Sequence, residues 1–247
     1  MSFTDKVLRG LKLVIVWGFM FALLFYGDKF LGFGISKLSM GVFALGIFTL
    51  PLALLITLPK LRSNFMNYFL LSDKKHLIIG LPILLAIGMR VVFNFVDYIL
   101  VWMGGDMIES GSGQFVPPSE TLSAMGAVIL VCVIGPFLEE VLFRYIPYTT
   151  VLWGANRAKE HSIILNKLYF NLFIEKNTKY VWGWILFTSF LFAMVHGPNI
   201  LNFWVYFIPG VVLAWLFLRY GFFSALLAHS IFNFYSDIGF EMLKYVL

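Results

Sequence analysis

Long apolar stretches alternate with short polar ones along the whole chain. Seven of them are long enough, at about 20 residues per crossing, to span a bilayer. They cover residues 9–26, 40–58, 77–103, 122–146, 180–196, 201–218 and 222–243, and the stretch after Phe30 leaves room for a short eighth element. The alternation typical of barrel strands is absent, and backbone groups in hydrocarbon must bond within their own segment. The pattern therefore predicts an all-α, polytopic transmembrane helical bundle.

The composition agrees with a membrane setting. The chain is 60% hydrophobic and only 13% charged, whereas about 25% of the residues of a soluble domain are charged. A loop at residues 104–121 is rich in glycine and proline and contains no basic residue. We expect one integral membrane domain over residues 1–247, in which the loop separates N-terminal spans (1–121) from core spans (122–247).

Basic residues predict the orientation, because they accumulate in cytoplasmic loops. With the N-terminus inside, thirteen of the 18 Lys and Arg residues fall on the cytoplasmic side and only Lys29, Lys37 and Lys244 on the other, with Arg90 and Arg144 inside spans. The net charge of +5 then reflects topology and contact with anionic lipid, and nucleic acid is not an expected partner. No cleaved signal or organellar signal is visible, so we expect a prokaryotic cell membrane.

Three charged residues stand inside the fourth apolar stretch: Glu139, Glu140 and Arg144. Charges at membrane depth are costly and are by default candidates for function. Glu140 and Arg144 are four residues apart with the acid first, the favoured order for an intrahelical ion pair. Glu139 is turned about 100° from Glu140 around the helix, so it can point elsewhere. The alternative is an ion-paired helix end near the inner membrane surface.

Two later spans also carry polar residues. His196 ends the fifth stretch, and by itself it is equally consistent with a packing or capping residue. His229 and Asn233 share one helix face because they are four residues apart, and Asp237 and Glu241 extend that face. A histidine and an asparagine so placed can donate two hydrogen bonds to a developing oxyanion, or they can hold helices together.

Together, Glu139-Glu-x-x-x-Arg144, Phe192-x-x-x-His196 and His229-x-x-x-Asn233 resemble the motifs of the CPBP family, the CAAX-processing and bacteriocin-processing intramembrane proteases, also called the Abi family. The resemblance covers residues 122–236 and includes 207–214, which is similar to that family's Phe-x-x-Gly-x-x-x-Gly element with alanine in the last place.

The resemblance implies a glutamate-dependent endopeptidase. In it, Glu139 and His196 would activate a water molecule, His229 and Asn233 would form the oxyanion hole, and Glu140 would pair with Arg144 to hold the helix. No motif pairs a serine or cysteine with a histidine, which also favours water as the nucleophile.

A metal is the alternative to direct activation of water. Glu139, His196 and His229 would also suit a catalytic Zn²⁺ site with two histidines, one carboxylate and an open position. The His-Glu-x-x-His spacing of zincins is absent, so we favour a site without metal or other cofactor and keep Zn²⁺ as the alternative.

Upright helices would leave Glu139 and His196 about 10 Å apart at 1.5 Å per residue. We therefore expect an irregular backbone near them. Gly135-Pro136 predicts a kink or break, His196-Gly-Pro ends its span, and a water-filled cavity is expected between. Residues 148–179 are typical of a cytoplasmic connection with an amphipathic surface helix.

The expected substrate is a membrane-associated peptide or protein, such as a bacteriocin or signalling-peptide precursor or a CAAX-type protein. Two other classes stay open: a non-proteolytic immunity or regulatory protein that binds a partner through the same bundle, and a proton-coupled transporter. The oligomeric state is open, as is the role of Arg90 and Asp97, which could pair with Glu140, Asp237 or Glu241.

Overall fold

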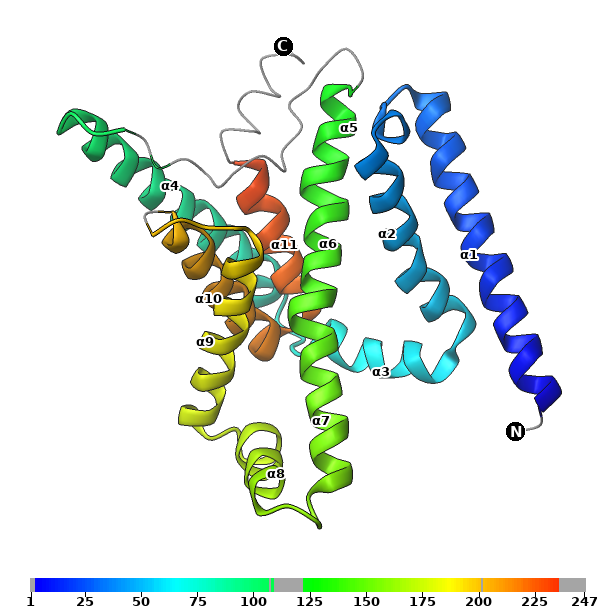
Figure 1. Ribbon diagram of the computed structural model, residues 1–247. Helices are drawn as coiled ribbons and strands as arrows, with labels where there is room; N and C mark the ends of the chain where they lie inside the picture. Colours follow the sequence, from blue (N-terminus) through cyan, green and yellow to red (C-terminus); the bar gives the residue numbers. More distant parts are fainter. Residues whose placement is uncertain (1–2, 107, 109–121, 201, 236–247) are drawn as a thin grey trace. The chain divides into compact units, whose positions relative to one another are not determined.

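The computed structural model describes residues 3–106, 108, 122–200 and 202–235, and this part of the chain is helical throughout its regular elements (Figure 1). Six of its helices are long and apolar enough to cross a membrane: Thr4–Leu31, Ser39–Thr57, His76–Trp102, Ala124–Ala158, Thr178–Val195 and Phe203–Tyr220. They correspond to six of the predicted stretches and confirm an all-α membrane fold. The seventh stretch is described only over the short apolar helix Phe222–Phe234, so Asp237 and Glu241 lie outside the described residues.

The chain forms two compact units. One contains Met1–Leu71, Gln114–Leu138 and His229–Leu247, and the other contains Ser72–Gly113 and Glu139–Ala228. Each unit is described by itself. The expectation of one domain divided near residue 121 stays a prediction.

The first unit is built on α1 (Phe3–Leu31) and α2 (Ser39–Thr57), which lie side by side. Asp28 holds the turn between them, because its carboxylate accepts hydrogen bonds from the backbone N–H groups of Ile35 and Ser36 at 2.9 and 2.8 Å. The short η1 (Ile35–Lys37) follows, and α3 (Pro59–Phe69) begins directly after α2 at a proline. The unit's core gathers the buried side chains of Ile35, Leu45, Leu122, Ala127 and Ile134.

A single continuous helix runs from Ala124 to Ala158 (Figure 1). It comprises α5 (Ala124–Ile129), the π-helical η3 (Leu130–Ile134), α6 (Gly135–Glu140), the π-helical η4 (Val141–Tyr145) and α7 (Ile146–Ala158). The predicted stretch ended at residue 146, whereas the helix continues to Ala158, through the first part of the predicted connection at 148–179. Residues 149–158 contain no proline, so nothing in the backbone stops the helix there.

The sequence predicted a kink or break at Gly135-Pro136, and the helix is not broken there. Instead, a wide π turn precedes the proline, and the N–H of Gly135 bonds to the carbonyl of Leu130. The same arrangement precedes Pro147 in η4 and Pro82, where the π-helical η2 (His76–Gly80) leads into α4 (Leu81–Trp102). A proline ring clashes with the preceding turn of a regular α-helix, and the wider turn removes that clash.

The second unit also contains α8 (Ile163–Leu168), the π-helical η5 (Tyr169–Ile174), α9 (Thr178–Val195), α10 (Phe203–Tyr220) and the start of α11 (Phe222–Phe234). α9 and α10 pack closely. A Cβ atom at Gly210 would come within 3.2 Å of both Phe192 and Ser189, so glycine permits this approach. Between the two helices, Asn199 and Asn202 exchange hydrogen bonds from backbone N–H to side-chain oxygen at 2.7 and 2.8 Å.

Candidate active site

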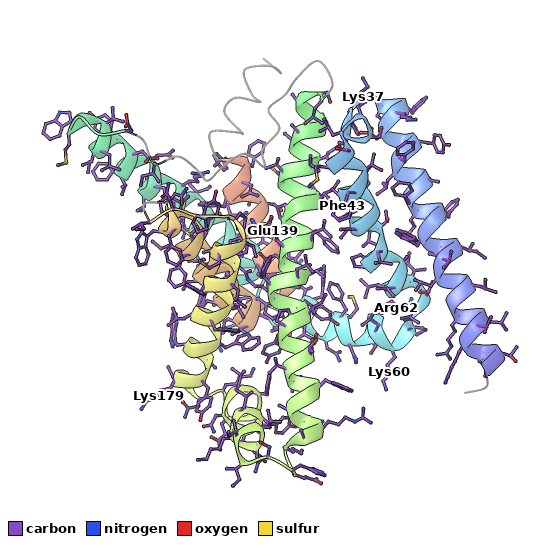
Figure 2. All side chains as sticks on the ribbon, viewed as in Figure 1. Lys37, Phe43, Lys60, Arg62, Glu139 and Lys179 are labelled. Atoms are coloured by element: carbon purple, nitrogen blue, oxygen red, sulfur yellow. The ribbon has the colours of Figure 1, made fainter. Side chains whose placement is uncertain are left out.

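Glu139 and His196 lie together in the second unit. Glu139 is on α6 and His196 is the residue that caps α9, and the Oε2 and Nε2 atoms are 3.9 Å apart. The continuous helix extends to Ala158, so Glu139 lies near its middle (Figure 2). The expected separation of about 10 Å rested on a span that ended at residue 146 and placed Glu139 near its inner end. The Glu139 and His196 side chains keep 30% and 22% of their surface exposed, whereas the Glu139 Oε2 atom itself is buried.

The His196 ring is fixed by two neighbours, Phe192 and Tyr206. Its Nδ1 atom lies 2.7 Å from the carbonyl oxygen of Phe192, and its face stacks on Tyr206 with centroids 4.4 Å apart. A carbonyl oxygen only accepts hydrogen bonds, so Nδ1 must carry the proton. In the neutral ring Nε2 is then an acceptor, and it faces the Glu139 carboxylate, which is also an acceptor.

Glu140 and Arg144 form a buried ion pair beside this site. Arg144 Nε lies 3.6 Å from Glu140 Oε2, and the two side chains are almost completely buried. Arg144 Nη2 also donates to the carbonyl of Gly210 at 3.4 Å, and its guanidinium lies 4.5 Å from the ring centroid of Phe192. A buried charge needs such partners, because desolvation is costly.

Phe192 connects the two pairs. Its carbonyl fixes the His196 ring, and its own ring lies over Arg144. Sequence reasoning included Phe192 only as a motif position, and it missed Tyr206 altogether, because no pattern distinguishes that tyrosine from the other aromatic residues. Gly210 was visible within the glycine element of residues 207–214.

His229 and Asn233 lie on α11, in the part assigned to the first unit. His229 is buried, with 4% of its surface exposed. Asn233 Nδ2 donates to the carbonyl of Val131 at 3.0 Å. That carbonyl lies in the π turn η3, where its expected donor would be residue 136, a proline without an N–H. Asn233 thus satisfies a carbonyl that the helix itself cannot.

Ser224 does the same in the second unit. Its hydroxyl donates at 3.1 Å to the carbonyl of Ile78, four residues before Pro82. In a regular helix that carbonyl would accept from residue 82, which has no N–H. Asp97, in turn, accepts a hydrogen bond from the N–H of Ile108 at 3.1 Å, so its carboxylate holds the chain that follows α4.

The zinc alternative needs three ligands. Among the residues that the structure describes, no three His, Cys, Asp or Glu side chains gather as they would around a metal ion. Glu139 and His196, which lie in one unit, would supply two ligands, and His229 belongs to the other unit. Zn²⁺ therefore stays an alternative for experiment.

Comparison with protein families matches residues 121–235 to the family described as type II CAAX prenyl endopeptidase Rce1-like. Neither the curated proteins nor the solved structures give a match. The matched range contains Glu139, Glu140, Arg144, His196 and the pair on α11.

Proposed function

Residues 121–235 form an Rce1-like type II CAAX prenyl endopeptidase domain of the CPBP family, and from this premise we propose that the chain is an intramembrane endopeptidase that cleaves a membrane-associated peptide or protein. The family is a peptidase family. The six long apolar helices support an integral membrane protein.

The observation that carries the proposal is the 3.9 Å approach of Glu139 Oε2 to His196 Nε2, with Nδ1 committed to Phe192. Two acceptors at this separation suit a water molecule that donates one hydrogen bond to each. The Glu139 carboxylate takes a proton as the water oxygen attacks the scissile carbonyl carbon. The proton then passes to the leaving nitrogen, the C–N bond breaks, and the products are a carboxylic acid and an amine.

Glu140 and Arg144 support this site without joining the reaction. Their ion pair is anchored to α10 through the Gly210 carbonyl and to α9 through the Phe192 ring. Glu140 is the neighbour of Glu139, so the anchored pair limits rotation of the helix that carries the base. Such preorganisation is a requirement of general-base catalysis.

The tetrahedral intermediate needs hydrogen-bond donors. His229 and Asn233 are proposed for this role, supported by their shared helix face and by the family resemblance. The Asn233 amide has two N–H groups, and its bond to Val131 fixes the orientation of the side chain.

The proposed substrates are precursors of bacteriocins or signalling peptides, or CAAX-type proteins, in a prokaryotic cell membrane with the N-terminus of the enzyme in the cytoplasm. The excess of Lys and Arg on the proposed inner segments supports this orientation. The partially exposed Glu139 and His196 side chains are consistent with entry of an extended peptide.

The test compares membranes from cells that express the wild type, Glu139→Gln or Glu175→Gln at equal abundance. Mass spectrometry of peptide termini identifies new ends produced by the wild type. We expect these ends to vanish with Glu139→Gln and to persist with Glu175→Gln, because Glu175 is an exposed carboxylate between η5 and α9. Ends that persist with Glu139→Gln would reject Glu139 as the base. If the wild type produces no ends beyond those of membranes without the protein, a non-proteolytic, partner-binding role is favoured.

A further inference from the structure

An apolar groove of about 370 Å³ lies between the α8–η5 segment and α9, away from the residues of the candidate active site. Leu168 and Leu172 line one side, and Tyr180, Trp184 and Phe187 line the other. We name it the α8–α9 groove. All of its residues belong to the second unit.

The groove crosses the level at which a membrane span begins. Its lining along α9 runs from Lys179 to Phe187, a rise of about 12 Å at 1.5 Å per residue. The candidate span starts at Thr178, so Lys179 marks its boundary, and Phe187 lies within it. The groove therefore has a charged end at the boundary of the candidate span and an apolar end within that span.

The residues at the charged end are of types that favour the headgroup region of a membrane. Lys179 is exposed in the first turn of α9, and Figure 2 shows it at that end of the helix. Lys176 lies three residues earlier and is also exposed. Tyr180 and Trp184 follow, and both residue types prefer the interface between headgroups and acyl chains. Basic residues here attract anionic lipids.

A glycine leaves the space for an acyl chain. Gly183 lines the groove, and a Cβ atom added there would meet no atom within 4 Å. Glycine is unfavourable inside a helix by roughly 1 kcal/mol relative to alanine, and no close helix contact at this position requires it. The open space beside Gly183 is therefore available to a ligand.

From these observations we propose that the α8–α9 groove binds one anionic phospholipid of the surrounding bilayer, with the headgroup at Lys179 and an acyl chain beside Gly183. Apolar burial drives the chain into the groove, and the lysine selects the headgroup charge. The inference does not depend on the proposed cleavage reaction.

Native mass spectrometry of the purified full-length protein tests the site. Phosphatidylglycerol and phosphatidylcholine with the same acyl chains are titrated, and the affinity for the first bound lipid is measured. We expect the wild type to prefer phosphatidylglycerol by about fivefold, as expected for one basic residue near the headgroup. Lys179→Gln should remove this preference without reducing phosphatidylcholine binding.

Gly183→Leu should weaken binding of both lipids, because its side chain fills the groove. Gly154→Leu is the matched control: Gly154 is also in a helix with no atom within 4 Å of an added Cβ, and it lies outside the groove. Equal affinity of the wild type for both lipids, or unchanged lipid binding in Gly183→Leu, would overturn the proposal. Unchanged lipid binding combined with altered cleavage would assign the groove to the peptide substrate instead.

Discussion

The Nδ1 atom of His196 lies 2.7 Å from the carbonyl oxygen of Phe192, four residues earlier in the chain. The bond uses a carbonyl at the end of α9, where helical donors run out. It sets the tautomer of the ring and turns Nε2 towards Glu139. A helix terminus thus does for this histidine what a second carboxylate does in other hydrolytic sites.

Replacing His196 by asparagine tests the roles of the two ring nitrogens separately. The asparagine amide can still donate to the Phe192 carbonyl, but it lacks the atom that faces Glu139. We expect cleavage to fall at least about 100-fold, with thermal unfolding close to that of the wild type. Cleavage of the identified peptide, together with the unfolding temperature in detergent, provides the measurement. Activity near the wild-type level would show that Nε2 has no part in the reaction.

The buried ion pair predicts strong coupling. Arg144→Leu or Glu140→Leu alone should destabilise the protein by about 3 kcal/mol, because each leaves a buried charge without its partner. The double variant should recover a large part of the loss, since neither charge remains. Chemical unfolding of all four proteins in detergent gives the coupling free energy. Additive losses would mean that the pair is not coupled.

The bond from Asn233 to Val131 predicts a rescue. Asn233→Ala should cost about 1 kcal/mol, because it leaves the partly buried Val131 carbonyl without this donor. Pro136→Ala restores a backbone N–H in that turn, so the double variant Asn233→Ala, Pro136→Ala should be more stable than Asn233→Ala alone. Unfolding measurements test this stability. If the rescued protein still fails to cleave, the second role of Asn233, at the oxyanion, is supported; if cleavage returns, Asn233 acts only by positioning.

Because the helices pack closely at Gly210, we expect this position not to tolerate a larger side chain. Gly210→Val should lower the free energy of unfolding by about 2 kcal/mol, because its side chain would press into Phe192 and Ser189. Gly154→Val, which has open space, should be nearly neutral by comparison. Thermal unfolding of both variants provides the test. An equal loss in both would attribute the effect to valine in a helix and not to packing.

A chelator distinguishes the two forms of the site. If Glu139 and His196 activate water directly, cleavage by the purified enzyme should be unchanged after extended treatment with a strong zinc chelator. Loss of activity that Zn²⁺ restores would instead support a metal held by Glu139, His196 and His229. Metal analysis of the same preparation provides an independent readout.

The helices were predictable because hydrocarbon imposes a length and an apolar composition on each crossing. The polar residues in those spans were visible for the same reason, since Glu139, Glu140 and Arg144 stand out in an apolar stretch. The end of the long helix at Ala158 was not predictable, because the apolar stretch ends at residue 146 and the helix continues into a more polar segment. The prolines at 82, 136 and 147 were visible in the sequence, but the π turn before each of them and the Phe192–His196 bond depend on backbone geometry.

Tyr206 and the α8–α9 groove show another limit. Each depends on two helices meeting side by side, and aromatic residues are too common in this chain, at 19%, for any one of them to be singled out. The open space beside Gly183 depends on how the α8–η5 segment packs against α9. Such features emerge only from the packed structure.

The π turns before Pro136 and Pro147 also affect how chain length can vary. Each wide turn holds one residue more than an α turn, so it acts as a local insertion that leaves the helix on either side in phase. A chain that lacked either proline could lose that residue and keep both glutamates facing the same way. Sequence comparison within this fold should therefore place one-residue gaps at 130–134 and 141–145. Without such a deletion, loss of a π turn would rotate the residues on one side of it by about 100° relative to those on the other side.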